Sequence, residues 1–189
     1  MKIAFRFNPD KSVQVMAYFL SRLGPTDKVK LMKLLYIADR NHFIQYGYPL
    51  TGSRQVAMDY GPLPSECLNL VDGGYQPDPG LPFRVLTVKD ATVSLVTKTP
   101  KTDGITKEEL ATLNKVVEGF GSAGTWDLKK HTHKFPEYER VYEVGTSKTI
   151  TYELLQEVYN RLSYGRPVVK EAALPHLQFS FKANSDADL

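Results

Sequence analysis

The stretch DKVKLMKLLYIADRNHFIQY, residues 27–46, decides the fold. Its apolar residues form two stripes at helical spacing. The first stripe consists of Leu31, Leu34, Leu35 and Ala38, and the second consists of Val29, Met32, Tyr36 and Phe43. A helix that is apolar over most of its circumference is usually buried on all sides. The pattern therefore predicts a central helix that ends near Gly47 and that spans roughly 30 Å at about 1.5 Å per residue.

Helix boundaries are marked on both sides of this stretch. Asn8-Pro9-Asp10 combines a capping side chain, a proline that needs no N–H and an acid in the first turn, so it begins a helix. Gly24-Pro25 ends that helix. Thr106 and Glu109 have the spacing of a capping box and begin another helix. Further helices are predicted after residue 65, after residue 125 and over residues 151–162.

Strand signals are fewer than helix signals. Residues 55–60 are predicted to form a short strand, and residues 84–88 and 92–96 flank a three-residue connection in a β-hairpin pattern. Together these elements predict an α+β fold. We expect a mostly helical single domain of about six helices around a long central helix, with a small antiparallel β-sheet or hairpin.

The composition is that of one globular domain. The chain has 189 residues, of which 42% are hydrophobic and 11% aromatic. We expect the domain to cover residues 1–169 and to be followed by a C-terminal extension, residues 170–189, with a partly disordered acidic tail. No apolar run reaches the length of a membrane span, and the N-terminus lacks the apolar core of a secretion signal. These features predict a cytoplasmic protein without a membrane partner.

Charge is distributed unevenly along the chain. The net charge is +3, but residues 1–54 contain nine Lys and Arg against three Asp and Glu. A basic first quarter favours an acidic protein partner or nucleic acid, and the alternative is an ordinary solvated surface. The whole-chain pI is below the level usual for dedicated nucleic-acid-binding domains, so nucleic acid is not the expected partner.

Candidate catalytic and metal-binding groups are few. Asp39 and His42 lie three residues apart and share a helix face, which suits either an oriented acid–histidine pair or a local hydrogen bond. His131 and His133 would face the same side of a strand but not of a helix, so a metal site there requires a strand. The single cysteine, Cys67, excludes an internal disulfide and is predicted to be a buried, unreactive thiol. We therefore expect no cofactor, no metal and no enzymatic activity.

Several motifs occur in the order in which a known family has them. KLMKLLYIAD at 30–39 resembles the K-L-x-K-L-L-Y-x-A opening of the Panacea domain, also called the SocA-like antitoxin domain. GYPL at 47–50 looks like its G-x-P-L, QVAMDYGP at 55–62 looks like its strand leading to Y-G-P, and Thr132-His133 resembles its late T-H. The resemblance covers about residues 10–162. Two tryptophans that the family often has, before the Y-G-P and after the T-H, are replaced here by Val56-Ala57-Met58 and by Phe135 with its neighbours.

The resemblance implies the antitoxin of a type II toxin–antitoxin system, which neutralises a cognate protein toxin by direct binding. The toxins in such pairs include small-alarmone-synthetase-like enzymes and inhibitors of translation. A related alternative is a proteolytic adaptor, which would deliver the toxin to a protease. An alternative from a different class is a hydrolase or nucleotide-binding enzyme that uses Asp39, His42 and His133.

Seven residues are candidates for contact with the partner. They combine basic side chains along one edge of the central helix, which would steer an acidic partner, with aromatic side chains of the kind that dominate binding energy. The candidates are Lys28, Lys30, Lys33, Arg40, Tyr46, Tyr48 and Tyr60. The alternative for the lysines is a solvated strip. For residues 60–62 the favoured interpretation is a rigid turn that packs against the central helix.

Overall fold

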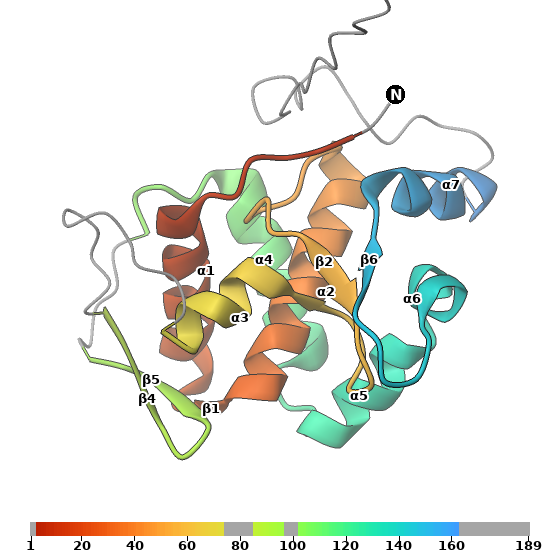
Figure 1. The fold of residues 1–189 in the computed structure, drawn as a ribbon. Helices are drawn as coiled ribbons and strands as arrows, with labels where there is room; N and C mark the ends of the chain where they lie inside the picture. Colours follow the sequence, from red (N-terminus) through yellow and green to blue (C-terminus); the bar gives the residue numbers. More distant parts are fainter. Residues whose placement is uncertain (1–2, 74–84, 97–101, 163–189) are drawn as a thin grey trace, which may run out of the picture.

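Helix α2 (Lys28–Tyr46) runs through the middle of the molecule, and the other elements surround it (Figure 1). The structure is a computed structural model that describes residues 3–73, 85–96 and 102–162. The other helices are α1 (Pro9–Leu23), α3 (Ser65–Val71), α4 (Lys107–Phe120), α5 (Thr125–His133), α6 (Pro136–Val141) and α7 (Tyr152–Leu162). The strands are β1 (Thr26–Asp27), β2 (Gln55–Ala57), β3 (Leu63–Pro64), β4 (Leu86–Lys89), β5 (Thr92–Leu95) and β6 (Lys148–Ile150). The predicted mostly helical α+β fold is confirmed, with seven helices in the described part of the chain.

Burial explains why α2 has so apolar a sequence. Every residue from 31 to 39 is buried, so no side of this stretch faces solvent. The helix begins after Asp27, whose carboxylate accepts a hydrogen bond from the Lys30 N–H (3.0 Å), and ends at Gly47 in the left-handed conformation (φ 89°). It contacts α1, α3, α4, α5 and α7. The prediction of a central helix is confirmed.

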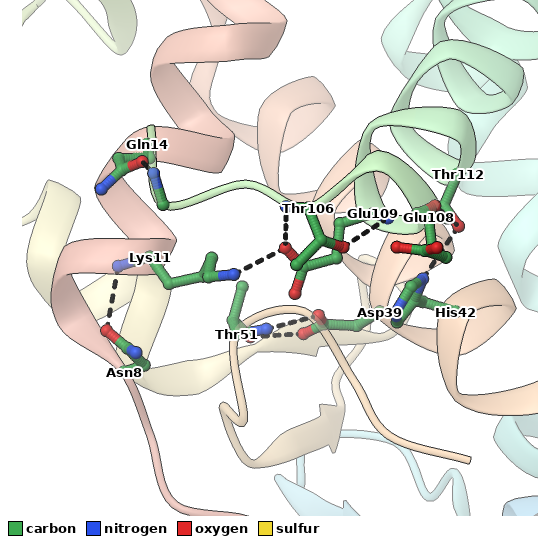
Figure 2. A network of polar contacts seen from close by, with 11 residues as sticks. Asn8, Lys11, Gln14, Asp39, His42, Thr51, Thr106, Glu108, Glu109 and Thr112 are labelled. Atoms are coloured by element: carbon green, nitrogen blue, oxygen red, sulfur yellow. Dashed lines mark hydrogen bonds and ion pairs between the residues drawn. The ribbon is translucent and has the colours of Figure 1, made fainter. Parts of the chain in front are cut away.

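Two more predicted helices begin at their predicted capping residues. The Asn8 side chain accepts a hydrogen bond from the Lys11 N–H (3.0 Å) at the start of α1. Thr106 and Glu109 form the capping box at the start of α4. A salt bridge of 2.6 Å between Lys11 and Glu109 joins the two helix starts (Figure 2). The caps therefore set where both helices begin, and the salt bridge connects the two ends.

The strands form two small antiparallel sheets in the orders β1-β5-β4 and β3-β2-β6. The predicted hairpin is confirmed as β4 and β5, with Leu86 opposite Leu95, but its connection has two residues and not the predicted three, because Lys89 pairs with Thr92. Asp90 and Ala91 connect these strands, and both have positive φ (49° and 61°), as the tight turn of a two-residue hairpin requires. The second sheet was predicted only in part, because β6 pairs with β2 from about ninety residues away in the sequence.

The core contains an aliphatic cluster and an aromatic cluster. The aliphatic cluster joins α1, α2 and α4 and includes Cys67, which is fully buried. The prediction that Cys67 is buried is confirmed, and burial raises the pKa of its thiol to about 12, which disfavours the reactive thiolate. The aromatic cluster joins the N-terminal segment to α2, α6 and α7. Its aromatic members include Phe5, Tyr36, Phe43, Tyr138 and Tyr152.

Some predictions concern parts of the chain outside the described residues. The C-terminal extension at 170–189 and its acidic tail belong to this group. Within the described residues, no helix is both long and apolar enough to cross a membrane.

Candidate partner-binding surface

Arg40, one of the seven candidates, forms an internal link between α2 and α6. Its Nε lies 2.5 Å from Oε1 of Glu137, whose side chain is fully buried and also accepts a hydrogen bond from the Tyr36 hydroxyl (3.0 Å). The guanidinium group lies 4.3 Å from the centre of the Phe135 ring. Because these contacts lie inside the domain, Arg40 serves first to connect α2 and α6.

Tyr46 and Tyr48 surround His42 at the C-terminal end of α2. Their ring centres lie 4.5 and 4.7 Å from that of His42, and both tyrosines are partly buried. His42 itself is buried, and its Nδ1 lies 2.9 Å from the Thr112 hydroxyl on α4 (Figure 2). These aromatic contacts pack the end of α2 against α4 and the following turn.

Asp39 is buried in a separate hydrogen-bond network. Its carboxylate accepts hydrogen bonds from the Thr51 N–H (2.9 Å) and from the Thr51 hydroxyl (2.5 Å) (Figure 2). It also accepts one from the Gln55 amide (2.9 Å). Burial raises the pKa of Asp39 to about 6, and the hydrogen bonds from Thr51 and Gln55 oppose that shift. The network ties α2 to the segment that leads into β2.

The enzyme alternative requires Asp39, His42 and His133 to act together. Asp39 bonds Thr51 and Gln55, whereas His42 contacts Thr112 and the two tyrosines of its cluster. His133 belongs to α5, where its ring packs 4.7 Å from that of Tyr138 on α6. In these contacts Asp39, His42 and His133 have different partners. The strand needed for a metal site at His131 and His133 is also not observed, because both lie in helix α5.

The burial of Lys33 contradicts both its prediction as a partner-contact residue and the alternative of a solvated strip. Its side chain is buried, with a relative exposure of 1%, and its Nζ donates a hydrogen bond to the Pro62 carbonyl (2.8 Å). The helix pattern alone placed Lys33 at an edge, but the turn at residues 61–62 lies against that edge and covers it. Burial, followed by the positive charge of Lys129, lowers the pKa of Lys33 to about 7.

The turn that covers Lys33 packs closely against α5. Gly61 has a φ of 92°, and a Cβ added there would lie 2.9 Å from Cδ2 of His133 and 3.0 Å from the Thr132 hydroxyl oxygen. Glycine is therefore required both by conformation and by space. The motifs K-L-L-Y, Y-G-P and T-H meet at this point, so the favoured interpretation of a rigid packed turn is confirmed for Gly61 and Pro62.

Lys30 and Lys28 end in contacts near the N-terminal end of α2. The Lys30 Nζ donates a hydrogen bond to the carbonyl of Gly121 (2.7 Å), where it satisfies the C-terminal end of α4. Lys28 forms a partly exposed salt bridge of 2.6 Å with Asp72. Lys28 and Asp72 also line a pocket of about 190 Å³.

This pocket and the aromatic residues beside it form the candidate surface. Apolar side chains from α2, α3 and the Y-G-P region line the pocket: Val29, Met32, Met58, Leu63 and Leu68. Tyr60 lies at its edge and is 59% exposed. The ammonium group of Lys129 on α5 lies 4.5 Å from the Tyr60 ring centre and 5.1 Å from that of Trp126, which is 65% exposed. We call the pocket together with Tyr60, Trp126 and Lys129 the α2–α5 surface.

The sequence pointed to only part of this surface. Lys28 and Tyr60 were predicted candidates, whereas Trp126 and Lys129 were not. Lys129 had no distinguishing signal, because lysine is ordinary on a short polar helix. Trp126 did have one, since it is the only tryptophan of the chain and stands among the polar residues of α5. Exposed tryptophan is enriched among residues that dominate binding energy.

The arrangement is that of a small α+β domain whose polar helix residues are used internally and whose exposed aromatic groups gather on one side. Residues 31–138 match the family model described as the antitoxin SocA-like, Panacea domain. The match covers more than half of the chain, so the protein belongs to this family of antitoxin-like domains. No curated protein and no solved structure matched the chain.

Proposed function

We propose that the protein is the antitoxin of a type II toxin–antitoxin pair and that it neutralises a protein toxin by binding it directly through the α2–α5 surface. Membership of the antitoxin family supports the general role. The observation that supports direct binding is the pair of exposed aromatic residues, Tyr60 and Trp126, beside an apolar pocket. Both residues lie within the part of the chain that the family model matches.

The surface has the anatomy of an interface core. A stable complex buries about 800 Å² on each partner and gains most of its binding energy from a few aromatic and arginine side chains around a desolvated centre. Here the pocket supplies the apolar centre, and Tyr60 and Trp126 supply large side chains next to it. Lys129 adds positive charge, which accelerates association with an acidic protein.

Co-expression tests the proposal. The chain is produced together with the product of the adjacent reading frame, in cells that contain or lack the major cytoplasmic proteases. A direct inhibitor restores growth in both strains and co-purifies with the toxin at unchanged toxin levels. Toxin loss only in the protease-containing strain would instead identify a proteolytic adaptor. Rescue without a complex in the protease-deficient strain would contradict neutralisation by binding.

Two variants localise the interface. The double substitution Tyr60→Ala and Trp126→Ala should weaken the complex at least about thirtyfold, because hot-spot side chains each contribute roughly 2 kcal/mol or more. The matched control is Leu110→Ala on α4, another partly exposed large apolar residue (37% exposed) that lies outside the α2–α5 surface. Equal affinities of the double variant and the control would place the interface elsewhere. The toxin class, whether alarmone synthetase-like or translation-inhibiting, follows from the activity of the co-purified protein.

A further inference from the structure

We propose that the α2–α5 surface recognises an acidic segment of the partner, with one apolar side chain of that segment in the pocket and its neighbouring carboxylates against the basic groups around Lys129. This inference rests on the proposed function, because it specifies the chemistry of the toxin segment that is bound. It has two independent parts, one concerning the shape and polarity of the pocket and the other concerning charge.

The apolar part follows from the pocket itself. Its walls are formed mainly by Val29, Met32, Leu63 and Leu68, and Met58 at its edge is 36% exposed. A cavity of about 150 Å³ between apolar side chains is large enough to bind benzene. The observed volume of about 190 Å³ therefore suits a phenylalanine or leucine side chain. Methionines in the wall adapt to such a guest, because their side chains are unbranched and polarizable.

The charge part follows from a group of basic residues shared by α2 and α5. Lys33, Lys129 and His133 all contact the turn at residues 60–62: Lys129 lies 4.5 Å from the Tyr60 ring centre, His133 packs against Gly61, and Lys33 donates a hydrogen bond to the Pro62 carbonyl. Burial, followed by the charge of Lys129, lowers the pKa of both Lys33 and His133. Among the described residues, no salt bridge involves any of these three side chains. Asp72 is the one carboxylate that lines the pocket. It forms a salt bridge with Lys28, so their two charges offset each other. Lys129 therefore supplies a positive charge that an incoming carboxylate neutralises, and the same carboxylate favours the charged forms of Lys33 and His133.

An acidic protein segment fits these features better than nucleic acid does. Nucleic acid is bound through rows of exposed lysine and arginine that contact successive phosphates. Here one of the basic groups, Lys33, is buried, and the two partly exposed lysines, Lys28 and Lys129, lie at an apolar pocket and beside its Tyr60. An apolar side chain between carboxylates satisfies both the pocket and the charge, whereas a phosphate backbone satisfies only the charge.

Three blocked peptides test both parts with the full-length protein. The first has a central phenylalanine between two pairs of acidic residues, the second replaces the phenylalanine by alanine, and the third replaces the acids by their amides. Methyl-labelled methionine is the reporter, because Met32 and Met58 line the pocket whereas Met16 is buried in the core on α1. The first peptide should shift the Met32 and Met58 signals and leave that of Met16 in place.

The two matched peptides separate the contributions. Replacing phenylalanine should weaken binding about tenfold, since burying a large apolar side chain accounts for a gain of that order. Replacing the acids should weaken binding about fivefold at low salt and less at high salt, as for partly exposed charge pairs. Failure of the first peptide to shift Met32 and Met58 would overturn the proposal, and equal binding of the acidic and amide peptides would overturn its charge part. Binding of a ten-residue oligothymidylate at the same methionines would identify nucleic acid instead.

Two lysine variants provide the matched control. Lys129→Gln should abolish the preference for the acidic peptide, whereas Lys130→Gln should retain it. Lys130 is the exposed neighbour of Lys129 on the same helix, so its substitution changes the net charge of the protein by the same amount. An unchanged Met16 signal shows that each variant is folded. Equal effects of the two substitutions would show general charge attraction and overturn a specific site. Failure here is distinguishable from failure of the antitoxin role, since growth rescue and co-purification do not depend on these peptides.

Discussion

The two ends of α2 use charged residues in opposite ways. Toward the C-terminal end, Asp39 and Arg40 each have partners of complementary chemistry supplied by the domain itself. Toward the N-terminal end, Lys33 donates to a neutral carbonyl and lies near two further basic groups, Lys129 and His133. The difference separates two roles: satisfied polar groups stabilise the fold, whereas the positive charge of Lys129 beside exposed aromatic residues favours binding of an acidic partner.

The largest expected effect on stability concerns Arg40, toward the C-terminal end of α2. Arg40→Ala should lower the free energy of unfolding by about 4 kcal/mol, because it leaves the fully buried Glu137 without its ion-pair partner. Urea denaturation measures this change. The matched control is Arg140→Ala, which removes the exposed bridge to Glu157 and should cost less than about 1 kcal/mol. Similar losses for both variants would show that Arg40 is not the internal link described above.

The next effect depends on pH and concerns Asp39. Its pKa is about 6 in the folded protein and near 3.8 in the unfolded chain, so the folded state binds more protons between these values. Stability should therefore fall as pH rises from about 4 to about 6, by about 3 kcal/mol relative to Asp39→Asn at about 1.4 kcal/mol per pKa unit. Denaturation of both proteins across this range measures the difference. Parallel profiles would show that the hydrogen bonds of Thr51 and Gln55 fully offset the effect of burial on the pKa.

Local signals made much of the fold predictable. The caps at Asn8 and Thr106 and the apolar stripes of α2 act within a few residues, so the sequence contains all that is needed to recognise them. The pairing of β6 with β2 depends on residues far apart in the chain and has no local signal. For the same reason the sequence misplaced Lys33. Its position on the helix was correct, but the turn around Pro62 that covers it comes from another part of the chain.

Lys33 should give a pH dependence of stability that is smaller than that of Asp39 and opposite in sign. Its pKa is about 7 in the folded protein and near 10.5 in the unfolded chain, so the unfolded state binds more protons between these values. The stability of the wild type should therefore rise by about 2 kcal/mol relative to Lys33→Met as pH increases from 7 to 9. Comparing the two proteins removes the contributions of other groups that titrate in this range. A constant difference between them would show that Lys33 is charged and compensated in the folded state.

The smallest effect on stability concerns the exposed aromatic residues. Tyr60→Ala and Trp126→Ala should each change the free energy of unfolding by no more than about 0.5 kcal/mol, because most of each ring is exposed and its contact with Lys129 is at the surface. Urea denaturation of the single variants measures this. A loss of several kcal/mol would assign the rings to the fold. A small loss combined with a weakened complex would show that these two rings serve recognition, whereas the C-terminal end of α2 serves stability.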